Sequence, residues 1–401
     1  MCLTKCILVF HAYMIYFIRS NKISLKVLVV DYGFLDSMTG ASNRHLGLLY
    51  TLAYLGHDVK RAALRVGPNK ILPEPAKLIF ENMKITQHNK RLLNYRKNDL
   101  QEYVSLVLDW KPDLVIMTLW FCGPTIDFTV PGYLINIHRS KKLSPKIIIE
   151  SSDVHWLRDH YENEYFDLKK TKDVDRKKTE EANIYQRADG VFAISYEDKI
   201  SIQSLSACNH SYFNNTKNNT PVFVWRYIGT PWNLSNNLNS SLFAKPMEKR
   251  QDLVFVGAGS VPTNLAAVSW FITQVWLSLL DSLPNLKFYI IGQWNIKGMI
   301  KRKMQSDNFL NVLKCSVMRY NNTFCKKYEG IIFTGKVSNL DLEKYLGDCR
   351  LFVSPIQFTT GVNTKNVLAL ETGIPLITTL NGSSGLVYKV NCLKYFINRS
   401  N

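Results

Sequence analysis

The chain has 401 residues, of which 46% are hydrophobic and 20% are charged, a composition that excludes fibrous and intrinsically disordered proteins. This length accommodates two domains, each with a core of its own. Lys and Arg outnumber Asp and Glu by 50 to 32, which gives a net charge of +18. Such an excess favours anionic partners, namely nucleic acid, an acidic membrane surface or phosphorylated small molecules, and does not choose among them.

The first 24 residues are the one candidate targeting segment. Their apolar run from Cys6 to Ile18 is interrupted by His11 and is shorter than the roughly 20 residues that a membrane helix needs. A weak membrane anchor and a start placed upstream of the folded domain both fit this run. We therefore expect a protein that is cytoplasmic or membrane-associated.

The eight cysteines form no Cys-x-x-Cys pair and no cluster with the spacing of zinc ligands. We interpret them as free thiols in a reducing compartment. No metal and no cofactor are expected from these residues.

The first part of the chain follows a strand–loop–helix–strand pattern. The run Lys26–Asp31 predicts a buried parallel strand, and a loop over residues 32–43 contains Gly40. A helix is predicted from about Arg44 to Gly56, where a glycine ends it. Further strands are predicted at Asp113–Thr118, Lys146–Glu150, Gly190–Ser195 and Val222–Ile228, with a polar helix over Asp167–Ala188.

The Asn- and Ser-rich stretch Ser235–Gln251 predicts a linker between an N-terminal domain of residues 25–234 and a C-terminal domain of residues 252–401. After it the pattern repeats. Strands are predicted at Asp252–Val256, Lys287–Ile291, Ile331–Thr334, Arg350–Ser354 and Leu376–Thr379, with a helix over Ala266–Leu280. The expected fold class is α/β, with two Rossmann-like doubly wound parallel-sheet domains that face each other across a cleft.

The most informative segment is Val353–Thr379, where a strand leads through a polar loop into a helix. The helix is predicted from about Thr364 to Gly373, with Val367 and Leu370 facing the core and Leu368 beside them. Its N-terminus offers unpaired N–H groups and the positive end of a helix dipole, which is a natural phosphate site.

Lys365 lies in the first turn of that helix, where a cation is unfavourable against the dipole. An anion bound between the two would remove the conflict. On this segment alone, a phosphate site and a glycine-capped helix with a solvated lysine are equally good interpretations.

This segment resembles the C-terminal signature of glycosyltransferase family 4 and its group 1 relatives. Four other segments resemble the same family, in the same order, and together they span about residues 26–390: KVLVVDYG with TGASNRHLGLLYTLAYLGHDV, ESSDVHWLRDHYENEY with ANIYQRADGVFAISYED, DLVFVGAGSVPTNLAAVSWF, and IIFTGKVSNLDLEKYLGDCRLFVSP. The resemblance implies the GT-B fold and a retaining transferase that takes its sugar from a nucleotide-sugar donor without a metal.

The resemblance also implies which residues form the site. The expected donor- and phosphate-binding residues are Gly40, Gly257, Gly259, Ser260, Thr334, Gly335, Lys336, Gly361, Val362, Asn363, Thr364 and Lys365. The expected catalytic residues are His155, which would hydrogen-bond the transferred sugar or the acceptor, and Asp153, which would orient it or act as a base. A capping Asp beside a structural His is the alternative, and an ordinary Rossmann turn is the alternative for Gly40. We expect His45 to be a surface or capping residue.

Two departures from the family set limits on this assignment. Leu368 and Thr360 stand where many members have Glu, and Glu371 lies one turn further along the helix, so the Glu role is not transferred to it. The chain also stops soon after Val387, which suggests a shortened variant or an incomplete sequence. Both departures are compatible with an inactive pseudo-enzyme.

The expected partner is a nucleotide sugar, with a glycan, lipid or protein acceptor and peripheral contact with an acidic membrane surface. A basic nucleic-acid-binding protein is a competing hypothesis, based on the charge and on the runs Lys169–Lys178 and Lys297–Lys303. No nucleic-acid-binding motif accompanies those runs, so we do not favour it. An epimerase of the same fold is a further alternative.

Overall fold

The computed structural model describes residues 24–31, 40–64, 72, 74–88, 90, 92, 100–118, 130–143, 145–167, 174–208, 220–226, 245–295, 307–318, 323–386 and 396–397. The chain divides into two compact units, the first comprising Met1–Trp156 with Asp175–Asn236 and the second comprising Leu157–Val174 with Asn237–Asn401. The N-terminal segment, most of the expected linker and the run Lys297–Lys303 lie outside the described residues. The expected domain boundaries stay a prediction.

The first unit is built on a parallel sheet of seven strands in the order β3-β2-β1-β4-β5-β6-β7. This is the doubly wound order, in which the direction of winding reverses between β1 and β4. The strands are β1 (Lys26–Asp31), β2 (Asp58–Ala63), β3 (Thr86–Gln87), β4 (Leu114–Met117), β5 (Lys146–Ser151), β6 (Gly190–Ala193) and β7 (Val222–Val224).

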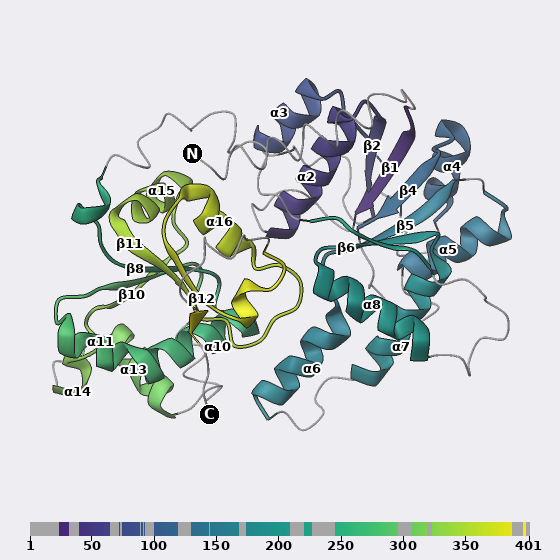
Figure 1. The fold of residues 1–401 in the computed structure, drawn as a ribbon. Coiled ribbons are helices and arrows are strands. Elements are labelled where there is room, and N and C mark those ends of the chain that lie inside the picture. The colour runs from purple at the N-terminus through teal and green to yellow at the C-terminus, as the bar shows by residue number, and fades with distance from the viewer. Residues whose placement is uncertain are drawn as a thin grey trace. The chain divides into compact units, whose positions relative to one another are not determined.

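Helices alternate with these strands along the chain. They are α2 (Gly40–Tyr54), α3 (Glu74–Asn82), α4 (Gln101–Trp110), α5 (Val130–Ser140), α6 (His155–Tyr165), α7 (Val174–Arg187) and α8 (Tyr196–Cys208). The part of α6 from Leu157 onwards belongs to the second unit. Apolar residues of α2 and α3 pack with those of β1 and β2 on one face of the sheet, and Figure 1 shows α4 and α5 on the opposite side. The helix predicted from Arg44 begins earlier, at Gly40, because the small and polar residues after Gly40 form its first turn instead of a loop.

The second unit repeats this topology with a parallel sheet of six strands in the order β10-β9-β8-β11-β12-β13. The winding reverses between β8 and β11. The strands are β8 (Gln251–Val256), β9 (Phe288–Ile291), β10 (Ile331–Gly335), β11 (Cys349–Ser354), β12 (Leu376–Thr379) and β13 (Phe396–Ile397). The expectation of two Rossmann-like parallel-sheet domains is thus confirmed, whereas their placement across a cleft stays a prediction.

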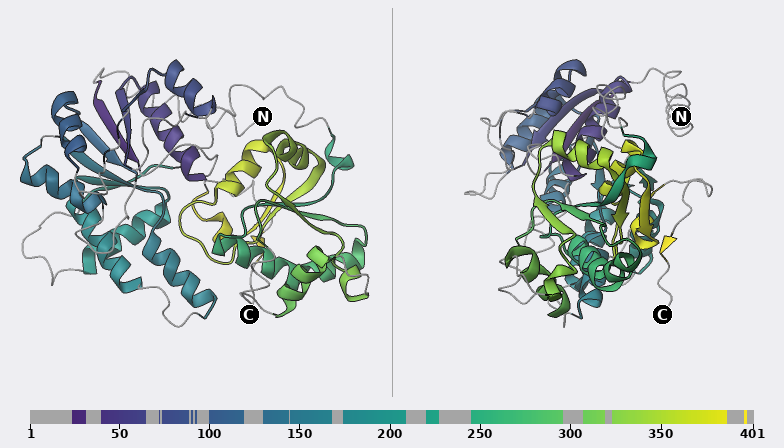
Figure 2. Two further views of the ribbon diagram at one scale, coloured as in Figure 1. Left: turned by 180° about the vertical axis from the view of Figure 1, so that it is seen from behind. Right: turned by 90° about the vertical axis from the view of Figure 1, so that its left-hand side faces the viewer.

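Two apolar clusters cover the two faces of the second sheet. The larger lies between the sheet and α10, η3 and α13, and the smaller lies between the sheet, α15 and α16. Figures 1 and 2 show these two sets of helices on opposite sides of the strands. The remaining elements of this unit are η2 (Met247–Lys249), α10 (Pro262–Phe271), η3 (Ile272–Trp276), α11 (Leu277–Ser282), α13 (Asp307–Met318), α14 (Thr323–Lys326), α15 (Asn339–Asp348), α16 (Thr364–Thr372) and η4 (Asn381–Ser383).

One helix among the described residues, Pro262–Ser282, is long and apolar enough to cross a membrane by length and composition alone. Half of its most apolar window is buried inside the protein. Phe271 and Trp276 of this helix belong to the larger apolar cluster and are almost completely buried. Packing against the sheet is therefore sufficient to explain its apolar composition.

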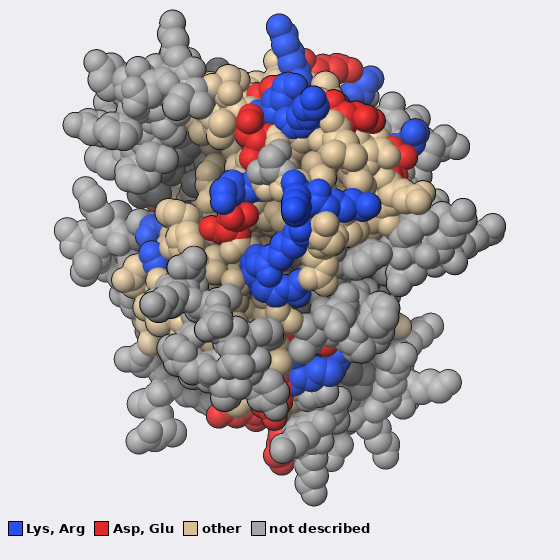
Figure 3. Space-filling model, turned by 90° about the vertical axis from the view of Figure 1, so that its right-hand side faces the viewer, with Lys and Arg blue, Asp and Glu red and all other residues tan. Residues whose placement is uncertain are grey.

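Lys and Arg side chains on the face shown in Figure 3 are interspersed with Asp and Glu side chains. Among the described residues of that face, the acidic side chains lie mostly near the top of the view, and Lys and Arg side chains gather near its centre.

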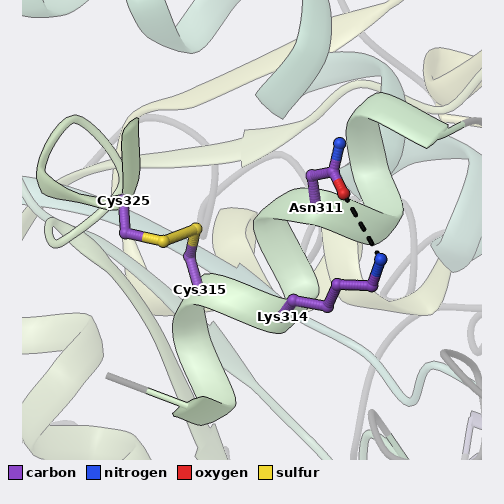
Figure 4. Close-up of a disulfide and its surroundings, with 4 residues drawn as sticks. All are labelled: Asn311, Lys314, Cys315 and Cys325. Carbon is purple, nitrogen blue, oxygen red and sulfur yellow. Dashed lines mark hydrogen bonds between the residues drawn. A yellow bond between two sulfur atoms is a disulfide. The ribbon is translucent and has the colours of Figure 1, made fainter. Parts of the chain in front are cut away.

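Cys315 of α13 and Cys325 of α14 form a disulfide, with their Cα atoms 5.2 Å apart (Figure 4). The interpretation of the cysteines as free thiols is therefore wrong for this pair. The two residues are ten positions apart, a spacing that matches no cysteine motif, and the return of α14 towards α13 brings them together. Cys349 is free and buried, and burial raises the pKa of its thiol to about 12.

We expect loss of the disulfide to destabilise the second unit. Closing a loop of this length restricts the unfolded chain, and the corresponding stabilisation is about 2–3 kcal/mol. The free energy of unfolding of Cys315→Ser, measured by denaturant titration, should fall by this amount. Adding a reductant should lower the stability of the wild type and leave the variant unchanged; a reductant effect of equal size on both proteins would contradict the assignment.

Candidate functional site

The helix α16 has the bounds that the sequence predicts, but a different face is buried. Asn366 and Ala369 are completely buried, whereas Leu370 is 37% exposed, so the expectation that Leu370 faces the core is wrong. The physical reason is that Ala369 and the partly buried Leu368 pack into the smaller apolar cluster, which turns Asn366 inwards. Val367 is half-buried.

The N-terminus of α16 is not capped by its own N-cap residue. Asn363 makes no side-chain cap bond; its Nδ2 instead lies 3.4 Å from the carbonyl oxygen of Gly382 and 3.4 Å from Oγ1 of Thr359. The first amides of a helix have no partner within the helix. The N–H groups of Thr364 and Lys365 therefore point out of the helix end. Such amides bind an anion well.

Lys365 adds a positive charge at the same point. Its side chain is half-buried, its Nζ lies 5.6 Å from the centroid of the Phe255 ring, and no carboxylate pairs with it among the residues that the structure describes. Burial lowers the pKa of Lys365 from 10.5 to about 8. An unpaired, desolvated cation at the positive end of a helix is unfavourable until an anion binds there.

The glycine loop after β8 is held against the loop after β9 by main-chain bonds. The N–H of Gly257 donates to Ile291 over 2.8 Å, and the N–H of Gly259 donates to Gln293 over 3.0 Å. Gly257 also approaches Asn264 of α10 closely, because an added Cβ would lie 2.6 Å from Nδ2 of that side chain. Ser260, the last residue expected in this loop, is exposed.

Gly292 joins this loop to the end of β10. Its N–H donates to the carbonyl oxygen of Gly335 over 3.0 Å, and a Cβ at Gly292 would lie 2.4 Å from the carbonyl oxygen of Gly257. Thr334 lies beside Gly335, to whose carbonyl oxygen its hydroxyl donates, and Lys336 is exposed. Gly292 thus connects the loops after β8 and β10 at one edge of the sheet. The Lys365 ammonium group lies near the same edge, because Phe255, the ring beside it, is close to the end of β8.

We expect Gly292→Ala to destabilise the second unit by about 2–4 kcal/mol, because the new methyl group meets backbone and the φ of 140° is strained for any other residue. Gly335→Ala is the matched control: its φ is 77°, yet nothing lies within 4 Å of its Cβ position, so strain alone should cost about 1–2 kcal/mol. Denaturant titration measures both. Equal losses would show that the approach of Gly292 to Gly257 is not tight.

In the first unit, Asp153 and His155 lie where β5 leads into α6, and both are half-buried. The hydroxyl of Ser151 donates to the carbonyl oxygen of Asp153 over 3.0 Å and bonds to the hydroxyl of Tyr185 over 2.8 Å. The N–H of His155 donates to Glu181 over 2.8 Å. The structure therefore holds the two residues at the carboxyl end of a central strand, and their chemical roles stay a prediction.

Sequence reasoning missed the buried charges of this unit. Arg61 makes a bidentate ion pair with Asp31 at 2.7 and 2.9 Å, and Arg44 pairs with Glu150. His45 was expected at the surface or as a cap; it instead lies half-buried, 3.9 Å from Glu150, and burial lowers the pKa of its imidazole. A charged residue at the end of an apolar strand, as in Lys146–Glu150, is the signal that would have indicated Glu150.

Gly40, which was expected among the donor-binding residues, is the first residue of α2.

Two doubly wound parallel sheets in one chain define the GT-B type of fold. Residues 250–393 match the family model of glycosyl transferases group 1, which covers the glycine loop after β8 and the whole of α16. A search of curated proteins finds no match.

Several solved structures have the same fold at low sequence identity. The glycosyltransferase WaaG, involved in lipopolysaccharide biosynthesis, superposes with a TM-score of 0.50 and 12% identity over 88% of this chain and 81% of its own. Sucrose-phosphate synthase of Thermosynechococcus elongatus gives 0.55 and 12% over 90% and 82%. Anabaena HepE, in complex with UDP-glucose, gives 0.51 and 13% over 91% and 83%.

Proposed function

We propose that this protein is a glycosyltransferase that binds the diphosphate of a nucleotide-sugar donor at the N-terminus of α16. The observation that carries the proposal is the half-buried ammonium group of Lys365, with which no carboxylate of the described residues pairs, beside a helix end that has no side-chain cap. The match of residues 250–393 to the glycosyl transferases group 1 model supports it, because it covers these same residues. The solved structure of HepE with UDP-glucose is consistent with this class of ligand for the fold.

The proposed chemistry follows from the charge that develops on the leaving group. When the bond between the anomeric carbon and the diphosphate oxygen breaks, negative charge grows on that oxygen. The Lys365 ammonium group and the first amides of α16 stabilise this charge in place, which accelerates bond breakage. We propose on this basis that the transfer needs no metal. Retention of the anomeric configuration, by the resemblance to family 4, is part of the same proposal.

The roles of Asp153 and His155 complete the proposal. His155 would hydrogen-bond the transferred sugar or the acceptor, and Asp153 would orient that group or accept its proton. Their position at the carboxyl end of β5 supports these roles, since ligands of doubly wound sheets bind at that edge.

We expect one class of nucleotide sugar to raise the melting temperature of the protein and Lys365→Ala to lose most of that shift, because the variant lacks the cation that meets the diphosphate. A thermal-shift screen with UDP-, GDP- and ADP-sugars measures this, and calorimetry should show at least tenfold weaker binding by the variant. Lys314→Ala, on α13 of the same unit, is the matched control and should bind like the wild type. Equal stabilisation of the wild type and Lys365→Ala would remove Lys365 from the site.

The affinity for a nucleoside diphosphate should also depend on pH. The pKa of Lys365 is about 8 in the free protein, and bound phosphate, an adjacent anion, raises it. Above pH 8 the free protein therefore has to take up a proton on binding, and the affinity should fall by up to about tenfold per pH unit until the pKa of the complex is reached.

Isothermal titration between pH 8 and pH 10 measures this dependence, because the terminal phosphate, whose second pKa is about 6, is almost fully ionised in that range. Lys365→Arg is the control, since its side chain stays charged at every pH tested. Its affinity should vary much less with pH. A wild-type affinity that is constant across the range would show that the Lys365 ammonium group does not meet the ligand.

A further inference from the structure

Asn366 is a completely buried polar residue in the first turn of α16. Its Nδ2 donates to the carbonyl oxygen of Gly382 over 2.7 Å and to Oγ1 of Thr378 over 3.3 Å. Burying a side-chain amide is costly unless it makes hydrogen bonds. A buried amide of this kind therefore specifies one arrangement of the groups that it contacts.

The group that Asn366 contacts is the short turn η4, which follows β12. Gly382 is packed so closely that a Cβ would lie 2.1 Å from Oγ1 of Thr378. Its N–H donates to Oγ1 of Thr379 over 3.1 Å, and Oγ1 of Thr378 donates to Ser354 at the end of β11 over 2.7 Å. These bonds place the carbonyl oxygen of Gly382 against the first turn of α16.

The same carbonyl oxygen also accepts a hydrogen bond from Nδ2 of Asn363, over 3.4 Å. An Asn at the N-cap normally turns its side-chain oxygen back to accept from the second or third amide of its own helix. Here the side chain is directed at Gly382 instead, and no cap bond forms. The carbonyl oxygen of Gly382, together with Oγ1 of Thr359, thus keeps the Asn363 side chain away from the amides that the proposed diphosphate needs.

We propose that Asn366 is a positioning residue for the phosphate site: it holds the carbonyl oxygen of Gly382 in place, and that carbonyl in turn holds Asn363 off the end of α16. The inference rests on the proposed function, because it takes the diphosphate to bind at this helix end. In the absence of Asn366, the carbonyl oxygen of Gly382 loses the shorter of its two side-chain hydrogen bonds and shifts. Asn363 then caps its own helix, and the ligand has to displace an internal hydrogen bond.

The test compares Asn366→Leu with the wild type by calorimetry, using UDP, GDP and ADP together with the matching nucleosides. For the diphosphate that the wild type binds, the variant should bind at least tenfold more weakly. Its affinity for the nucleoside alone should be unchanged, because the base and ribose do not meet the helix end. Asn311→Leu, the same substitution on α13, is the control and should change neither affinity. If Asn366→Leu does not fold, Asn366→Ser takes its place, because serine is smaller and also lacks the carboxamide group.

A second substitution separates positioning from a general loss of structure. Adding Asn363→Ala to Asn366→Leu removes the side chain that would cap the helix, and should restore at least fivefold of the lost affinity for the diphosphate. A purely structural role for Asn366 would lower the melting temperature without this recovery, and that result would overturn the inference. Equal diphosphate affinity of the wild type and Asn366→Leu would overturn it while leaving the proposed function intact. A wild type that binds no nucleoside diphosphate would overturn both.

Discussion

The ammonium group of Lys365 at the N-terminus of α16 is a charge that no carboxylate neutralises in the part of the chain that the structure describes. Lys365 is half-buried beside the positive end of α16, where both desolvation and the helix dipole act against an ammonium group. Among the described residues no carboxylate pairs with it. Its Nζ lies 5.6 Å from the centroid of the Phe255 ring. A cation–π contact of this kind contributes only about 1–2 kcal/mol. In the free protein the ammonium group is therefore electrostatically unfavourable beside the helix end, and a bound anion would remove this cost. The local structure thus favours an anionic ligand.

The topology explains why so many groups meet at this point. Both sheets have the order in which winding reverses next to the first strand, so the loops after the central strands diverge and leave room at their carboxyl ends. In the second unit, bonds between the main chains of Gly257, Ile291, Gly292 and Gly335 join three of these loops. Loops fixed in this way lose little conformational entropy on binding, so less of the binding free energy is spent on ordering them.

Much of this fold was predictable from the sequence, because strands buried on both faces are continuous apolar runs. KVLVVD has the same bounds as β1, and Leu376–Thr379 has the same bounds as β12. Groups that depend on distant residues were not predictable: the pair of Arg44 and Glu150 joins positions 106 residues apart, and the disulfide follows no spacing rule. Asn366 escaped notice because a helical apolar pattern gives no weight to a polar residue, so Val367 and Leu370 were assigned to the core in its place.

The leucine at position 368 has a consequence for the electrostatics of the site. A residue at that position lies three residues after Lys365 on the same helix, a separation at which oppositely charged side chains pair. A glutamate there would give the ammonium group an internal partner, whereas Leu368 packs into the smaller apolar cluster and leaves it without one on that side. The low local dielectric that lowers the pKa of Lys365 also strengthens its attraction to a bound phosphate. A leucine at position 368, in place of a carboxylate, thus leaves the positive charge of this helix end available to an anion.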